Sequence, residues 1–326
     1  MNCFYKITKF VLIGVFMTTM VACSEKPVIA FENKGNPLIR HIFTADPSAR
    51  VFGDKLYLYT SHDRDDSDLD AHFDMTDWHV FSTSDLEHWL DHGAFFSLED
   101  ISWATKQAWA PDAINRNDKY YFYYPVEQAK IGVAVSDSPT SGFVDPLGKP
   151  LIDKTGNENI VGNEPIDPAI LIDDDGQAYM YFGCRNARVV KLKSNMIELD
   201  GEIHAIQING IEQFTEKNGG GWYGEGPWVF KRGDYYYYMY SNGWEKNTTL
   251  VYAISTQAQG PFEYIGEVMT PVGAGTSHGS ITEFNGKWYV FYHSTMLSNQ
   301  GKQRSVHFDE IFFDEDGKII PLTYKP

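Results

Sequence analysis

The sequence has 326 residues, 43% of them hydrophobic, and a formal net charge of −17 at pH 7. The apolar share excludes wholesale disorder, and the acidic balance excludes nucleic acid as a partner, because phosphate backbones repel an acidic surface. An uncharged substrate is expected instead.

The first 22 residues have the composition of an export signal. Lys6 and Lys9 precede an apolar stretch at 10–22, which is too short to anchor stably in a bilayer. The stretch ends at Ala22-Cys23, and a small residue before a cysteine resembles the end of a bacterial lipoprotein signal. We therefore expect a lipoprotein signal peptide over 1–22, a short tether over 23–36, and a chain that is exported and lipid-anchored to the cell envelope through Cys23. An ordinary secretory signal is the alternative.

Five short segments of nearly the same pattern follow at intervals of 53 to 64 residues. Each is a turn dipeptide followed by aromatic and branched residues, which is typical of a hairpin turn leading into a strand. The segments begin at Asp54, Asp118, Gly176, Gly233 and Gly286. No long stretch shows apolar residues at helical spacing. This period, filled with short strands, predicts an all-β fold, a five-bladed β-propeller over 37–326.

A polar residue precedes each turn by a nearly constant interval. These residues are Asp46, Asp112, Asp167, Glu225 and His278, seven to ten positions ahead of the second turn residue. The first strand of each propeller blade lines the central channel, so we expect all five side chains to converge at one end of it. Four carboxylates placed together raise one another's pKa, a cost that favours a catalytic role over a structural one.

These motifs resemble those of glycoside hydrolase family 43 along nearly the whole chain, from Asn36 to Pro321. The matching segments are Ala45-Asp46-Pro47, Trp109-Ala110-Pro111-Asp112, Ile166-Asp167-Pro168, Gly224-Glu225-Gly226-Pro227 and Ser277-His278-Gly279. The resemblance implies a five-bladed propeller that hydrolyses α-L-arabinofuranosides or β-D-xylosides with inversion. It implies that Asp46 is the general base, Glu225 the general acid and Asp167 the group that modulates the pKa of the acid.

The resemblance also implies binding roles. His278 matches a central histidine that contacts a bound cation or its waters in several relatives. Arg304 matches a sugar-binding arginine, and a purely electrostatic role toward acidic residues is the alternative. No cofactor is required, but a structural calcium ion at the propeller axis stays open, with a neutral hydrogen-bonding role as the alternative for His278. Asp112 is a candidate sugar contact, and loop or supporting chemistry would explain it equally well. Trp109 and Trp222 are candidate stacking platforms, and core packing is the equal alternative.

The proposed roles make opposite demands on neighbouring acids. Inversion needs an acid and a base about 6.5–9.5 Å apart on opposite faces of the sugar. Glu225 must keep its proton near neutral pH, so its pKa should be raised, and an ionised Asp167 nearby would raise it. Asp46 must stay ionised in the same field, and Arg304 or a cation would offset that repulsion.

The predicted function is an inverting glycoside hydrolase that removes terminal α-L-arabinofuranosyl or β-D-xylosyl residues from plant-type polysaccharides or oligosaccharides. One alternative is a surface glycan-binding propeller without catalysis. Another is a related propeller glycosidase of other sugar specificity. Retaining fructan-cleaving enzymes carry Asn-Asp-Pro-Asn and Arg-Asp-Pro motifs, from which Ala45-Asp46-Pro47-Ser48 and Ile166-Asp167-Pro168 both depart.

An acidic run begins at Asp63 and continues through Asp70. It lacks the glycine and closing glutamate of a calcium-binding loop, so the pattern predicts a solvated loop. Because loops over a propeller channel shape the pocket, the long first-blade loop that carries this run, from His62 to Trp78, is a candidate for determining specificity.

Overall fold

The computed structural model describes residues 27–325 apart from 67–71, 156, 158–159, 161–163, 211–221 and 244–246. The predicted signal peptide and Cys23 lie outside these residues. The described part is built almost entirely of strands, with one short 3₁₀ helix, η1 (Leu98–Asp100). No helix within it is long and apolar enough to cross a membrane.

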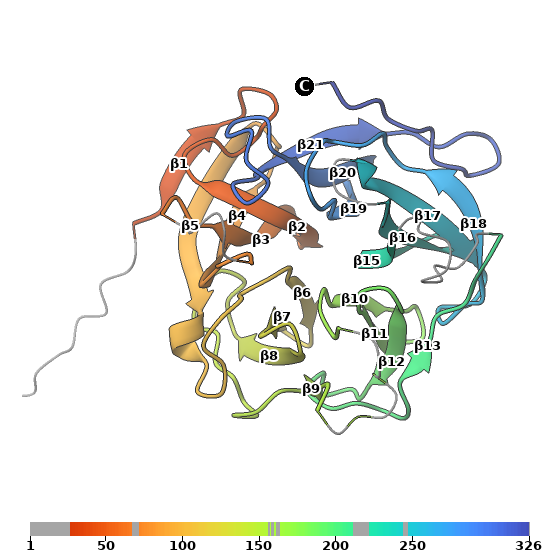
Figure 1. Cartoon of the computed structure of the whole chain (residues 1–326), viewed down its shortest axis with the longest axis horizontal. Helices are drawn as coiled ribbons and strands as arrows, with labels where there is room; N and C mark the ends of the chain where they lie inside the picture. Colours follow the sequence, from red (N-terminus) through yellow and green to blue (C-terminus); the bar gives the residue numbers. More distant parts are fainter. Residues whose placement is uncertain are drawn as a thin grey trace, which may run out of the picture.

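The strands form five sheets arranged as a ring around a central axis (Figure 1), which confirms the predicted five-bladed propeller. Blade 1 contains β1 (Ile29–Glu32), β2 (Phe43–Phe52), β3 (Lys55–Asp63), β4 (Asp77–Thr83) and β5 (His88–Ser97). Blade 2 contains β6 (Asp112–Arg116), β7 (Lys119–Val126), β8 (Lys130–Ser136) and β9 (Ile152–Asp153). Blade 3 contains β10 (Ala169–Ile172), β11 (Ala178–Phe182), β12 (Arg188–Leu192) and β13 (His204–Ala205).

Blades 4 and 5 complete the ring. Blade 4 contains β15 (Trp222–Arg232), β16 (Tyr235–Gly243), β17 (Thr249–Ser255) and β18 (Phe262–Glu267), with β14 (Ile208–Asn209) running parallel along β18 at its edge. Blade 5 contains β19 (Gly279–Phe284), β20 (Lys287–Ser294) and β21 (Ser305–Ile311). The strands β2, β6, β10, β15 and β19 lie nearest the axis (Figure 1).

The repeated turn dipeptides join the first two strands of each blade, as predicted. At Asn285-Gly286, between β19 and β20, both residues have positive φ, 52° and 76°. Two successive positive φ values are the requirement of a type I′ hairpin turn, which matches the twist of the strands that it connects. Asn117-Asp118 in blade 2 has the same two positive φ values, whereas the turns of blades 1, 3 and 4 have one, at Gly53, Gly176 and Gly233, so the repeat specifies a tight turn but not one turn type.

The ring closes between blades 1 and 5 through the chain that precedes β2. The amide of Leu38 donates to the carbonyl of Val306 at 2.8 Å, and the amide of Thr44 donates to the carbonyl of Arg304 at 2.9 Å. Leu38, Phe284 and Val306 are buried in one shared apolar cluster. These hydrogen bonds and the burial of this apolar cluster between blades 1 and 5 hold the two ends of the propeller together.

The predicted tether over 23–36 is too long. Ile29–Glu32 form β1, which pairs antiparallel with β5 as the outer strand of blade 1. The ring of Phe31 stacks on Trp89 with centroids 6.4 Å apart. Phe31 thus packs on the blade and the backbone of this segment pairs with it, so the propeller begins at Ile29.

Candidate active site

The inner strands begin with a shared pattern around the axis. Four of the five blades place a proline there, at positions 47, 111, 168 and 227, and Gly279 takes the equivalent place in blade 5. The preceding residues are Asp46, Ala110, Asp167, Gly226 and His278, and all of them line a small axial cavity of about 20 Å³. The structure therefore presents two aspartates and one histidine in equivalent positions of this ring.

The backbone at these aspartates is unusual. Asp46 has φ 53° and Asp167 has φ 55°, in the left-handed region that costs free energy for residues other than glycine. At Asp46 the pairing of β2 with β3 is interrupted between Ala45 and Ser48. A β-bulge re-aims the side chain that it carries, here toward the axis.

Glu225 joins the ring from one residue earlier in blade 4. Gly224 and Gly226 flank it with φ 71° and 61°, and the pairing of β15 with β16 shifts on both sides of Glu225. These glycines permit a turn of the backbone that directs Glu225 toward His278.

Asp112 does not reach the cavity where a sugar contact was predicted. It lies two residues after Ala110, the true equivalent of Asp46, and is completely buried. Its carboxylate accepts hydrogen bonds from Ser48 and the backbone amide of Ile170, and it forms an ion pair with Arg50. Both carboxylate oxygens of Asp112 are thus bonded to groups of blades 1 and 3, so Asp112 links blades 1, 2 and 3 and has a structural role.

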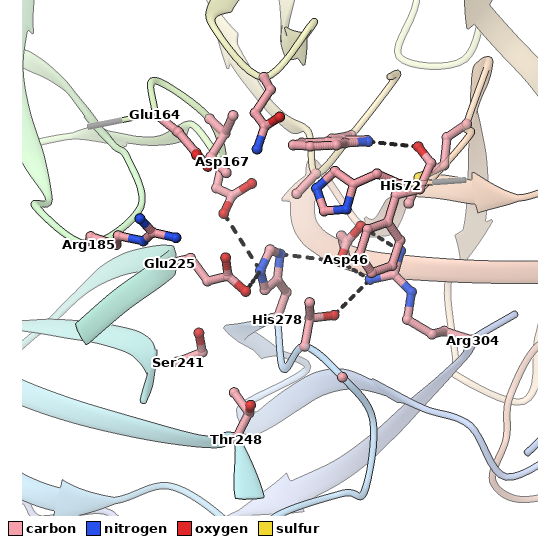
Figure 2. Close-up of a pocket in the computed structure, with 18 of the residues that line it drawn as sticks. Asp46, His72, Glu164, Asp167, Arg185, Glu225, Ser241, Thr248, His278 and Arg304 are labelled. Carbon is pink, nitrogen blue, oxygen red and sulfur yellow. Dashed lines mark hydrogen bonds and ion pairs between the residues drawn. The ribbon is translucent and has the colours of Figure 1, made fainter. Parts of the chain in front are cut away.

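A cavity of about 290 Å³ lies above the axial ring, and Figure 2 shows the side chains around it. It contains the three predicted catalytic acids together with His278, Arg304 and Trp109. The remaining lining residues are His72, Phe73, Met75, Ala110, Gln128, Glu164, Ile166, Arg185, Ser241, Gly243, Thr248, Gly275 and Thr276.

His278 occupies the centre of the acidic groups. Its Nδ1 lies 3.2 Å from Oδ1 of Asp46, and its Nε2 lies 3.4 Å from Oε1 of Glu225 and 3.6 Å from Oδ2 of Asp167. Burial would lower the pKa of His278, but the charges of Asp167 and Asp46 raise it well above its usual value. An imidazolium at this point neutralises part of the charge of three carboxylates.

Asp46 is held in its ionised form. Burial alone would raise its pKa, but the positive charges of Arg304 and His278 outweigh burial and hold the pKa well below its usual range. Ser61 donates a hydrogen bond to Oδ2, and the backbone amide of Asp46 donates to Nδ1 of His293 at 3.1 Å. A carboxylate that is ionised and fixed in this way has the state required of a general base.

Arg304 is committed to two acids rather than free for a sugar. It is 2% exposed, and its guanidinium donates to Asp63 at 2.8 and 2.9 Å and to Asp46 at 3.0 and 3.4 Å. The remaining N–H group donates to Thr276 at 3.0 Å. All five donors of the guanidinium are thus engaged, so the geometry supports a positioning role toward Asp46 in place of the predicted sugar contact.

Asp63 is the partner that the sequence did not reveal. It was predicted to lie in a solvated acidic loop, but it is 2% exposed at the end of β3. It accepts hydrogen bonds from both the backbone amide and the side chain of Arg304. Its place at the start of an acidic run concealed this role.

The prediction was a raised pKa for Glu225 and an ionised Asp167, whereas in the structure the pKa of Asp167 is raised and that of Glu225 is lowered. Burial and the negative charges of Glu225 and Asp46 raise the pKa of Asp167 to about 7, against the attraction of His278. Burial also raises the pKa of Glu225, but its contacts with His278 and the Cys184 thiol leave that pKa lowered. The thiol lies 3.6 Å from Oε2 of Glu225, and burial raises its own pKa, so it stays protonated and can donate. Of these two carboxyls, Asp167 is therefore the one that keeps its proton to the higher pH.

Of the two predicted stacking platforms, Trp109 forms part of the cavity wall. Trp109 lines the cavity and is 8% exposed, with its indole N–H donating to the carbonyl of Phe73 at 3.0 Å. Trp222 begins β15, and its side chain lies outside the described part of the structure. Trp109 thus combines a packed edge with a surface on the cavity.

Several cavity residues lie outside the repeated motifs, although Phe73 belongs to the first-blade loop that was predicted to shape the pocket. Phe73, Gln128 and Arg185 come from connections between strands and have positive φ of 45°, 58° and 68°. None of them lies in the repeated motif ahead of a turn. Positive φ in residues other than glycine concentrates at this cavity, as it commonly does at functional sites.

The geometry separates two carboxyls across one ring. Asp46 and Glu225 lie on opposite sides of the His278 imidazole. The two carboxyls stand about 6.5–9.5 Å apart in inverting glycosidases and about 5–5.5 Å apart in retaining ones, and a whole imidazole ring between Asp46 and Glu225 favours the wider spacing. Both carboxyls also line the cavity of about 290 Å³, which gives a reacting group access to acid and base.

Comparison with known proteins places this site among carbohydrate-cleaving enzymes. The family model described as glycosyl hydrolases family 43 matches residues 35–319. The chain is 38% identical to a xylosidase/arabinosidase of Humicola insolens, over 89% of this chain and 99% of that protein. It is 35% identical to a xylosidase/arabinosidase of Bacteroides ovatus, over 87% of this chain and 96% of that protein.

Solved structures of family 43 enzymes have the same fold as this chain. A family 43 β-xylosidase/α-arabinofuranosidase from a compost metagenome, in a calcium-free form with xylotriose, superposes with a TM-score of 0.77 at 33% identity, over 91% of this chain and all of that one. A family 43 enzyme of Xanthomonas citri in complex with xylose gives a TM-score of 0.76 at 33% identity, over 90% of this chain and 94% of that one.

Proposed function

The chain belongs to glycosyl hydrolases family 43 and is a glycoside hydrolase, and on that premise we propose that it removes terminal α-L-arabinofuranosyl or β-D-xylosyl residues with inversion. The observation that carries the stereochemistry is the placement of Asp46 and Glu225 on opposite sides of His278. The names of the relatives support the two sugars. The volume of about 290 Å³ is near the lower limit of small-ligand pockets, which favours a chain end over a long polymer segment.

In the proposed reaction, Asp46 takes a proton from the water that attacks the anomeric carbon. The oxygen of that water forms the new bond as the glycosidic bond breaks, and Glu225 gives a proton to the leaving oxygen. Arg304 and His278 keep Asp46 ionised before the reaction.

The acid needs a proton at neutral pH, and Asp167 holds one nearby. Single ligand atoms of Asp167, Glu225 and His278 all lie within 4.8 Å of one another. We propose that a sugar oxygen at Glu225 shifts this shared proton from Asp167 to Glu225, because the two carboxyls titrate as one unit. Asp167 thereby modulates the acid.

Proton NMR of hydrolysis tests this function. The protein is incubated with p-nitrophenyl α-L-arabinofuranoside and, separately, p-nitrophenyl β-D-xyloside, and the first anomeric signal is recorded. The expected first product has the configuration opposite to the substrate, and Glu225→Gln and Asp46→Asn abolish turnover. Asp137→Asn, at a carboxylate whose side chain is 82% exposed, serves as the matched control. A first product of retained configuration would remove Asp46 from the role of base.

We also propose that the axial cavity takes a calcium ion held through water. Asp46 and Asp167 line this cavity of about 20 Å³, which has room for the ion, and its bound waters would lie in the cavity of about 290 Å³ that the same two residues also line. The cavity would hold one ion beside His278. The positive charge of that ion would act on Asp46 together with the charge of Arg304. A rise in melting temperature with calcium, lost in Asp167→Asn, is the expected result, and an unchanged melting temperature would contradict it.

We infer export and lipid anchoring from the sequence around Cys23. Lys6, Lys9 and the apolar stretch at 10–22 support it, as does the Ala22-Cys23 pair. The test is labelling of the expressed full chain with a fatty-acid probe. Label on the wild type and none on Cys23→Ala is expected, whereas an unlabelled, secreted wild type would favour the ordinary signal.

A further inference from the structure

Blade 1 contains a second cluster of titratable side chains outside the cavity. It consists of His41, His62, Asp77, His79 and Asp91, none of which lines the cavity of about 290 Å³. The strands explain the grouping, because β3 and β4 pair antiparallel with Ser61 opposite Trp78, and alternate residues share one face of the sheet. His62 therefore lies beside Asp77 and His79.

Three ligand atoms in this cluster converge. Nδ1 of His62 lies 2.8 Å from Oδ1 of Asp77, and Nε2 of His79 lies 3.5 Å from the same oxygen. Single ligand atoms of these three residues all lie within 4.8 Å of one another. Such spacing allows one ion to contact two imidazole nitrogens and one carboxylate oxygen.

The residues behind these ligands have the arrangement of a metal's outer shell. The other nitrogen of His79, Nδ1, faces Oδ1 of Asp91 at 3.7 Å, and it is buried without a hydrogen-bond partner. Asp91 is fixed by His41 at 2.8 Å and by the amide of Gly93 at 2.7 Å. A metal-bound histidine characteristically directs its second nitrogen at a carboxylate, which sets its tautomer and orientation.

A purely hydrogen-bonded network explains this cluster less well. The contact of His62 with Asp77 satisfies such a network, whereas neither nitrogen of His79 lies closer than 3.5 Å to a carboxylate oxygen. The side chain of His79 is 12% exposed, and a buried nitrogen without a partner is costly. A bound cation would satisfy Nε2 and draw Nδ1–H toward Asp91.

We propose that His62, Asp77 and His79 form a binding site for a divalent transition metal of the zinc class. Two imidazoles and one carboxylate suit zinc, whereas calcium and magnesium prefer oxygen ligands. The side chains of His62 and Asp77 are each 20% exposed, so solvent can reach the site and a water can complete the tetrahedron.

The position of the site predicts its effect. It links the end of β3 to the start of β4, the two strands between which Phe73 and Met75 extend to the cavity wall. His41 belongs to the segment that closes the ring against blade 5. A metal here cross-links the base of a cavity loop, so binding stabilises the fold and takes no part in the proposed hydrolysis.

Isothermal titration of zinc into the chelator-treated protein tests the proposal, with melting temperature recorded alongside. One equivalent is expected to bind and to raise the melting temperature. His79→Gln and Asp77→Asn are expected to lose that equivalent, and Asp91→Asn to weaken it by about 10–100-fold, the usual effect of removing an outer-shell partner. His88→Gln, at an exposed histidine of the same blade, is the matched control and binds as the wild type does.

Cobalt provides a readout that does not depend on the stability of a variant. Cobalt(II) in the wild type is expected to give the intense visible absorption of a four-coordinate site, which added zinc abolishes. Absence of one-equivalent zinc binding to the wild type would overturn the proposal. So would zinc binding that survives in His79→Gln and disappears in His278→Gln, since the ion would then occupy the cluster of Asp167, Glu225 and His278.

Discussion

Replacing Arg304 by methionine tests the electrostatic account of the base most directly. The side chain is 2% exposed and pairs with both Asp46 and Asp63. Methionine replaces the aliphatic stem of the side chain and removes the guanidinium with its charge, so two buried carboxylates lose their shared partner. Breaking a buried ion pair in this way typically costs about 3–5 kcal/mol, and we expect a loss of that order in the free energy of unfolding.

The same substitution should change catalysis in a defined direction. Without the guanidinium, burial and neighbouring acids raise the pKa of Asp46, so the acidic limb of kcat/KM moves to higher pH. In the wild type the pKa of Asp46 lies below its unfolded value, so its stabilising contribution is present above about pH 4 and is lost as pH falls further. The stability difference between Arg304→Met and the wild type should therefore shrink in acid.

Urea unfolding at several pH values and kcat/KM profiles on an aryl arabinofuranoside measure both effects. Arg40→Met is the matched control, since Arg40 is exposed and donates to the carbonyl of Asn36 at 2.9 Å. The double variant Asp63→Asn with Arg304→Met should lose less stability than the sum of the two single variants. A loss below about 1 kcal/mol in Arg304→Met, with an unmoved acidic limb, would refute the reasoning, because that is the range of exposed pairs.

Three further predictions concern the other side of His278. Asp167→Asn removes the carboxyl whose pKa is raised to about 7, so the alkaline limb of kcat should move to lower pH, measured in a pH–rate profile. Cys184→Ala removes a thiol contact that lowers the pKa of the general acid, so the same limb should move to higher pH. Gly226→Ala places a Cβ 2.8 Å from Cδ2 of His278, so kcat should fall by about 10²-fold. Gly233→Ala, with a similar φ of 60° and nothing within 4 Å, should lower the melting temperature and leave kcat unchanged.

The fold and the gathering of the three proposed catalytic acids in one cavity could be predicted because both are local in the sequence. A hairpin turn needs particular residues, and a turn dipeptide ahead of aromatic residues recurs once in every blade. Asp46, Asp167 and Glu225 precede those turns on the innermost strands, where five-fold symmetry brings them together. The interval from the polar residue to the turn does not identify the residue at the axis in blade 2. The proline at the start of each inner strand does, and in blade 2 it marks Ala110 rather than Asp112 as the equivalent of Asp46.

The surroundings of these acids depend on contacts between distant segments. Arg304 and Asp63 are separated by 241 positions, and only closure of blade 5 on blade 1 brings them together. An acidic loop is ordinarily solvated, so composition alone argued against a buried partner at Asp63. The walls supplied by His72 and Arg185 come from connections whose sequences carry no repeat.

The proton balance of the acid pair shows why distance matters more than composition. The sequence places two acids near His278 and predicts a raised pKa at the general acid. Glu225 has His278 at 3.4 Å and the Cys184 thiol at 3.6 Å, and Asp167 has His278 at 3.6 Å and the amide of Gly226 at 2.9 Å. At Asp167, however, burial and the negative charges of Glu225 and Asp46 outweigh these contacts. The better-stabilised carboxyl ionises first, so the retained proton resides on Asp167. A substrate oxygen that competes for Glu225 would reverse this order, which makes the protonation of the acid depend on occupancy of the site.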